Sequence, residues 1–172
     1  MVESEDMDNT TKLYDEDFVL WSREQAEALR AAARGASNQA IDWENVAEEI
    51  ESLGISDKRE LRSQICRIIE QLLKLQFSRT RDPRLGWEGS IDDARDQIER
   101  LIEDSPSLRP EVAVLISAEM RRGFRKAVRE LEKHGEVDPA TLNSIQTAAY
   151  TEEQILGDWF PPEAEPQSCG SE

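Results

Sequence analysis

Residues 41–54, IDWENVAEEIESLG, and residues 55–79, ISDKRELRSQICRIIEQLLKLQFSR, decide the fold of this chain. In the second stretch, apolar residues recur at steps of four, three, four and three, the period of a helix that packs along a seam. We therefore predict a long central helix that begins after Ser56. Its seam consists of Leu61, Ile65, Ile68, Leu72 and Leu75, widened by Ile69, Leu73 and Phe77, and its polar face carries Arg59, Arg62, Arg67, Lys74 and Arg81.

The first stretch predicts a shorter, acidic helix in front of the central one. Asp42 is a suitable N-cap, and Gly54 is expected to end the helix and to act as a hinge before the next one. The side chains expected to face the core are Trp43, Val46, Ala47, Ile50 and Leu53. The two stretches together thus predict a helical hairpin at the centre of the fold.

The rest of the chain predicts further helices and no strand, because no segment shows sustained alternation. A first helix is expected at about 15–33, with an apolar stripe of Tyr14, Phe18, Trp21, Ala28, Leu29 and Ala32. A loop over 82–89 precedes a helix over 90–104, and another helix runs over 107–134 and stops at Gly135. A weak helix over 138–149, a capping box from Thr151 to Gln154 and an aromatic anchor at 159–161 follow. The fold class is all-α, a helical bundle of about five main helices plus a short C-terminal helical segment.

Length and composition limit the classes of protein to which this chain can belong. A chain of 172 residues fits one domain, expected at 13–161 between a disordered acidic N-terminus (1–12) and a disordered tail (162–172). No apolar run is long enough to cross a bilayer, and the acidic start does not resemble a signal peptide. Cys66 and Cys169 form no disulfide framework. We expect a cytoplasmic protein without a membrane segment.

Charge is distributed in blocks along the chain. The net charge of −16 argues against general binding to nucleic acid, because phosphates are repelled by most of the surface. Residues 58–84 nevertheless hold 8 basic and 3 acidic groups, and residues 120–134 hold 6 and 2. The segments around them are acidic, so oppositely charged helices can lie side by side.

Several segments together resemble the bacterial family known as domain of unknown function 29. They are YDEDFVLW (14–21), IDWENVAEEIESLG (41–54), LLKLQF (72–77), WEGSIDDARDQIERLIEDSPSL (87–108) and YTEEQILGDWFP (150–161), and they follow the order of that family. The resemblance implies an all-helical domain of this size. It implies no catalytic residues.

The acidic helix offers a candidate metal site. All-α nucleotide pyrophosphatases hold Mg²⁺ with Glu-Glu-x-x-Glu on one helix and Glu-x-x-Asp on the next, because magnesium prefers hard oxygen ligands. The partial match here is Glu48, Glu49 and Glu51, with Asp93 and Asp96 on a later helix. Its first motif is one residue too short, and its second helix is not the next in the chain. A solvated acidic face is the simpler interpretation.

Basic residues offer a candidate anion-binding site. Arg129 and His134 have the Arg-x4-His spacing of HEPN-type ribonucleases, although Glu130 replaces the amide or small acid usual after the arginine. The simpler interpretation of His134 is that a cation before Gly135 suits the end of a helix. The candidate anion-binding residues are Arg62, Arg67, Arg122, Arg129 and His134, with Trp87 as a stacking partner.

No complete catalytic set emerges, since there is one histidine and no glycine-rich phosphate loop. We expect a non-enzymatic protein-interaction module without a cofactor, whose partner is another protein or a second copy. Two alternatives stay open. One is a Mg²⁺-dependent nucleotide pyrophosphatase-like enzyme that uses the Glu48, Glu49 and Glu51 helix, and the other is an RNA-binding protein or HEPN-like nuclease that uses Arg129 and His134.

Overall fold

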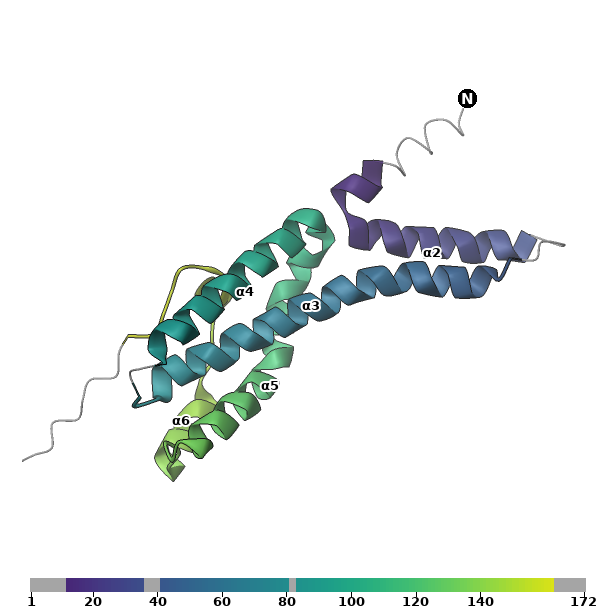
Figure 1. Ribbon diagram of the computed structural model, residues 1–172. Helices are drawn as coiled ribbons and strands as arrows, with labels where there is room; N and C mark the ends of the chain where they lie inside the picture. Colours follow the sequence, from purple (N-terminus) through teal and green to yellow (C-terminus); the bar gives the residue numbers. More distant parts are fainter. Residues whose placement is uncertain (1–11, 36–40, 81–82, 163–172) are drawn as a thin grey trace, which may run out of the picture. The chain divides into compact units, whose positions relative to one another are not determined.

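The computed structural model describes residues 12–35, 41–80 and 83–162, and within these ranges the chain is helical without any strand (Figure 1). This confirms the predicted all-α class. A short helical stretch at 12–16 comes first. The elements after it are α2 (Phe18–Gly35), α3 (Trp43–Phe77), α4 (Arg84–Asp104), the 3₁₀ helix η1 (Pro106–Glu111), α5 (Val112–Lys133), α6 (Pro139–Thr147) and α7 (Glu152–Leu156).

The predicted hinge at Gly54 is wrong, because α3 runs without interruption through it. A Cβ atom at this position would lie 2.3 Å from Ser22 Oγ and 3.4 Å from the Val19 backbone, both on α2. Glycine is therefore used here for a close approach of two helices rather than for a break. The helical hydrogen bonds on both sides outweigh its propensity cost of about 1 kcal/mol.

Other boundaries also differ from the sequence-based prediction. Helix α4 begins at Arg84, so most of the expected loop over 82–89 is helical, and Pro83 precedes the helix instead of interrupting a loop. The helix expected over 107–134 begins as the 3₁₀ helix η1, which contains Pro110, and becomes α-helical at Val112. Its predicted stop is confirmed, because Gly135 has a φ of 67° and the Glu136 N–H donates to Leu131 O at 3.0 Å.

The described chain forms two compact units. Unit 1 comprises the described residues up to Arg62 together with Gln97–Val112, and unit 2 comprises Ser63–Asp96 and the described residues from Ala113 onward. The single domain expected at 13–161 stays a prediction. The disorder expected at both ends lies outside the described residues, except that Lys12 is helical and Pro162 is exposed.

Unit 1 contains a helical hairpin, in which α2 runs antiparallel beside the first half of α3 (Figure 1). The carboxylate of Asp17, which is buried, caps α2 by accepting a hydrogen bond from the Leu20 N–H at 2.8 Å. The same carboxylate accepts bonds from the backbone N–H and the hydroxyl of Ser107, at 2.6 and 2.9 Å. Asp17 thereby joins the start of α2 to η1.

Unit 2 holds the predicted seam of α3 except Leu61, which belongs to unit 1. From Ile65 to Leu75 its members are at most 1% exposed, and they form a core with Ile91 of α4 and Leu131 of α5. Gly123, in the middle of α5, lies against Ile69, so α5 and α3 cross closely at this glycine. Lys74, however, does not lie on the polar face as predicted. It is buried and lies over the Trp87 ring, 5.3 Å from its centroid.

A buried arginine fixes the C-terminal segment of unit 2. Arg95 of α4 donates to Ile155 O at 3.1 Å and to Gln154 O and Trp159 O at 3.1 and 2.7 Å. Its guanidinium lies 4.9 Å from the centroid of the Phe160 ring. The predicted capping box of α7 is present, with reciprocal bonds between Thr151 and Gln154. The C-terminal aromatic residues are thus anchored to α4.

Candidate functional site

The candidate metal ligands are spread over both units. Glu48 and Glu49 are exposed on α3 in unit 1, and Asp93 and Asp96 are exposed on α4 in unit 2. Glu51 accepts a hydrogen bond from Arg30 of α2 at 2.7 Å. Within the described ranges, no group of three or more His, Cys, Asp or Glu side chains is placed to hold a metal ion. The metal site stays a hypothesis without a ligand cluster to support it.

The candidate anion-binding residues are all exposed. Arg129 and His134 lie on unit 2, five residues apart, which places their side chains about 140° apart around the end of α5. The His134 Nε2 lies 4.0 Å from a Glu130 carboxylate oxygen, and Arg122 lies 3.7 Å from Glu119. The remaining candidates, Arg67 in unit 2 and Arg62 in unit 1, are exposed on α3.

The expected stacking partner, Trp87, is occupied by Lys74. Burial lowers the pKa of Lys74 relative to an ordinary lysine, although Glu70, 3.5 Å away on the same helix, opposes this change. Glu70 also pairs with Lys126 of α5 at 3.4 Å. Lys74, Glu70 and Lys126 therefore form a charged network that links α3 to α5 beside an aromatic ring.

The thiol of Cys66 is enclosed in unit 2. Its residue is 1% exposed, and burial raises the pKa of the thiol above that of a free cysteine. The nearby cations of Lys126 and Arg122 act in the opposite direction but do not reverse the change. A thiol with a raised pKa is a poor nucleophile, so the role of Cys66 is packing. The other cysteine, Cys169, lies outside the described residues.

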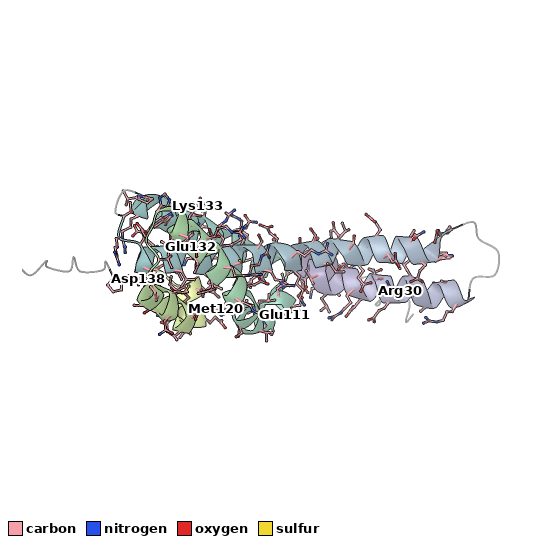
Figure 2. The ribbon with its side chains drawn as sticks, turned by 90° about the horizontal axis from the view of Figure 1, so that it is seen from below. Arg30, Glu111, Met120, Glu132, Lys133 and Asp138 are labelled. Atoms are coloured by element: carbon pink, nitrogen blue, oxygen red, sulfur yellow. The ribbon has the colours of Figure 1, made fainter. Side chains whose placement is uncertain are left out.

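One side of the hairpin in unit 1 is charged. Arg30 of α2, which Figure 2 labels, contacts Glu44 at 3.2 Å and Glu51 at 2.7 Å, both on α3. Residues three, four or seven apart share a helix face, so Ile55, four residues after Glu51, belongs to this same side of α3. This side faces water with charged groups that are paired across the two helices.

The opposite side of the hairpin is apolar, and we call it the apolar face. On α3 its members follow one another at steps of three, four and three, and on α2 they are eleven residues apart, three turns along one face. Val46 is 41% exposed and Leu53 is 46% exposed, and the others are partly exposed. The apolar face consists of Phe18, Leu29, Trp43, Val46, Ile50 and Leu53.

An aromatic cluster continues the apolar face at the start of α2. The Tyr14 ring lies edge-on to the rings of Phe18 and Trp21, at centroid distances of 5.7 and 4.8 Å. Tyr14 is 50% exposed. The sequence correctly placed these aromatic residues on one stripe, but it predicted that Val46 and Leu53, which are exposed on the apolar face, point into a core. The residues that lie between α2 and α3 are small, namely Ala26, Ala47 and Gly54. This is the signal in the sequence that the larger apolar residues lie on a surface.

Comparison with known proteins places the chain in a family. An alpha-helical protein of unknown function from Rhodospirillum rubrum has a similar structure, with a TM-score of 0.67 and 21% sequence identity. The match covers 84% of this chain and 89% of that chain, and at this identity it shows the fold alone. No curated protein is significantly similar to the chain. The family model of the domain of unknown function DUF29 matches residues 13–160, so the chain belongs to the DUF29 family.

Proposed function

We propose that this protein is a non-enzymatic interaction module that binds a protein chain through its helix surfaces. The apolar face of the hairpin carries this proposal. Large apolar side chains are normally buried between helices, whereas here Val46 and Leu53 are 41% and 46% exposed on one side of two helices. An apolar surface of this kind, bordered by polar residues, is typical of a protein-binding site.

Three polar side chains outside the apolar face hold parts of the fold together. Asp17 caps two helices, and Arg95 donates to three backbone carbonyls of the C-terminal segment. Glu136 accepts a hydrogen bond from Thr80 beyond the end of α3. These groups stabilise the fold.

Photocrosslinking in the native cells tests the proposal. A photoreactive phenylalanine analogue replaces Leu53 on the apolar face or, as the control, Ile55, which is similarly exposed at 41% on the charged side of the same helix. We expect protein adducts from position 53 and only background from position 55. Equal background at both positions would contradict the proposal.

Two other functions stay as hypotheses with their own tests. A magnesium-dependent enzyme requires that Mg²⁺ raise the melting temperature and that Glu48→Gln remove this effect. An RNA-binding protein or nuclease requires salt-sensitive RNA binding that is lost in Arg129→Ala or His134→Ala. A positive result in either test would displace the interaction module as the preferred function.

A further inference from the structure

We propose that a row of exposed arginines on α5 binds an acidic helix of a partner protein. The row consists of Arg121, Arg125 and Arg129, and we call it the arginine stripe. It lies in unit 2, whereas the apolar face of the hairpin lies in unit 1. The inference therefore goes beyond the proposed function, because it adds a second surface and states the charge and the shape of what binds there.

The arginine stripe follows one side of α5. Its members are four residues apart, so each lies about 40° further around the helix and about 6 Å further along it than the one before. All three are exposed, and Gly123 and Ala127 on the opposite side are buried. From 121 to 129 the chain holds five basic residues and no acidic one. The stripe is therefore a positive surface on a chain whose net charge is −16.

The three guanidinium groups have no acidic partner in the part of the chain that the structure describes. The basic residues beside them do, since Arg122 lies 3.7 Å from Glu119 and Lys126 lies 3.4 Å from Glu70. Like charges four residues apart repel each other on a helix, so the stripe lowers the stability of α5. Such a conflict between local sequence and fold is typical of functional surfaces, where a ligand supplies the missing charge.

The residues before the stripe favour a protein over a nucleic acid as the partner. Val114 and Ala118 precede Arg121 on the same side of α5, at steps of four and three, and Val114 is 69% exposed. The acidic Glu132 follows Arg129 on this side and ends the positive surface. A helix with one apolar side chain followed by carboxylates four residues apart complements this order, because guanidinium groups bind carboxylates through two parallel hydrogen bonds. A phosphate backbone has no counterpart for Val114.

The length of the stripe favours a short partner segment. Three arginines at this spacing extend over about 12 Å. At physiological salt the Debye length is about 8 Å, so a segment that stays on the stripe is largely screened from the acidic groups elsewhere on the chain. A longer polyanion would extend onto the rest of a surface that is negatively charged overall, and it would be repelled there. A short acidic helix avoids this repulsion.

Fluorescence anisotropy with a designed peptide tests the inference on the full chain. The probe is a fluorescein-labelled helical peptide with one leucine followed by three glutamates that are four residues apart. One comparison probe is a scrambled peptide of the same composition, whose glutamates do not share a side of the helix. The other is a labelled single-stranded RNA of about twelve nucleotides, which tests for a general phosphate-binding surface.

Two triple variants of equal charge serve as a matched pair. The stripe variant combines Arg121→Ala, Arg125→Ala and Arg129→Ala. The control variant makes the same change at three exposed arginines of unit 1 that have no partner within the described ranges, and these are Arg23, Arg34 and Arg59. Circular dichroism and melting temperature report on folding. We expect the stripe variant to melt at or above the wild-type temperature, because it loses the repulsion between like charges.

At about 20 mM NaCl we expect the matched peptide to bind the wild-type chain and the control variant equally, and the stripe variant at least tenfold more weakly, since each exposed ion pair contributes a factor of up to about five. Val114→Ser should weaken binding of the peptide as well. The inference would be overturned by a wild-type chain that does not bind the matched peptide, or by an equal loss of binding in the control variant.

Three further results would also overturn it. Equal binding of the scrambled peptide would show that the surface responds to total charge alone. Tighter binding of the RNA would identify a nucleic acid as the partner, and a lower melting temperature of the stripe variant would show that the arginines serve the fold. Crosslinking from position 53 concerns the apolar face and does not depend on the stripe, so the proposed function and this inference can fail separately.

Discussion

The carboxylate of Asp17 and the serine Ser107, ninety positions apart in the chain, form two hydrogen bonds that join the beginnings of two helices. One oxygen of Asp17 accepts from the Ser107 backbone N–H at 2.6 Å, and the other accepts from its hydroxyl at 2.9 Å. The second oxygen also accepts from Leu20 N–H at 2.8 Å. The side chain of Asp17 therefore satisfies unpaired N–H groups at two helix starts.

Asp17→Ala should lower the free energy of unfolding by about 2 kcal/mol, because it leaves the backbone N–H groups of Leu20 and Ser107 without an acceptor. Asp17→Asn should cost about half as much, since an amide retains only one acceptor oxygen. Urea denaturation measures both values. Asp15→Asn, a change at an exposed position in the preceding turn, is the control and should stay within about 0.5 kcal/mol of wild type. An equal loss in the control would contradict the capping role.

The Ser22 hydroxyl should determine the cost of adding a side chain at Gly54. A Cβ atom at position 54 would lie 2.3 Å from Ser22 Oγ, which itself donates to Val19 O. Gly54→Ala should therefore destabilise the hairpin by about 1 kcal/mol despite the better helix propensity of alanine. In the Ser22→Ala background the same change should be neutral or stabilising. A double-mutant cycle by urea denaturation measures this coupling, and additive effects would show that the two positions do not meet.

Gly54 also shows how far local sequence signals determine the fold. The apolar period of α3, the capping box of Thr151 and the stop at Gly135 depend on a few neighbouring residues, and the sequence predicted them correctly. A glycine inside a helical pattern has two readings, a break or a close approach. The choice between them depends on α2, which packs against it from elsewhere in the chain. Sequence alone therefore predicted a hinge where the helix is continuous.

Burial was harder to predict than helix position. The apolar stripes of α2 and α3 were correctly located, but the exposure of Val46 and Leu53 was not predicted. Lys74 lies on the buried side of α3 because Glu70 and the Trp87 ring offset the loss of hydration. Leu53 is exposed because the helices of the hairpin touch through smaller residues. Both outcomes depend on tertiary packing, which periodicity does not specify.

Two glycines within helices should respond in opposite ways to alanine. A Cβ atom at Gly123 would lie 2.5 Å from Ile69 Cγ2 and 2.9 Å from its Cβ, and Ile69 is fully buried. Gly123→Ala should therefore cost about 1–3 kcal/mol of unfolding free energy through overpacking. Gly86, in the first turn of α4, has open space around it, so Gly86→Ala should gain up to about 1 kcal/mol. Thermal unfolding gives both signs, and a stabilising Gly123→Ala would contradict the close crossing.

Arg95→Lys should release the C-terminal segment. The guanidinium serves three backbone carbonyls and the Phe160 ring at once, and an ammonium group cannot reproduce this planar arrangement. We expect a loss of about 2–3 kcal/mol, with faster amide exchange over residues 150–161. Arg100→Lys, at an exposed position one and a half turns further along α4, is the matched control. Unchanged exchange in Arg95→Lys would show that the aromatic contacts hold the segment without the arginine.

Glu136 should make the fold sensitive to acid. Burial alone would raise the pKa of its carboxyl group, but hydrogen bonds from the hydroxyls of Thr80 and Ser78 and from the Arg79 backbone outweigh this effect, so the pKa lies below its ordinary value. A carboxyl group whose pKa is lower in the folded state stabilises the fold above the pKa of the unfolded chain. This contribution is lost as the pH falls through the lower pKa of the folded state.

Glu136→Gln should therefore lower stability at neutral pH by about 1–2 kcal/mol and by progressively less in acid, since a neutral amide cannot be protonated there. The measurement is urea denaturation of wild type and variant between neutral pH and about pH 3, with the difference between the two curves as the readout. Glu132→Gln, at an exposed position on the last turn of α5, supplies the control. A difference between wild type and Glu136→Gln that stays constant over this range would show that the carboxylate charge contributes nothing to the link between α5 and the end of α3.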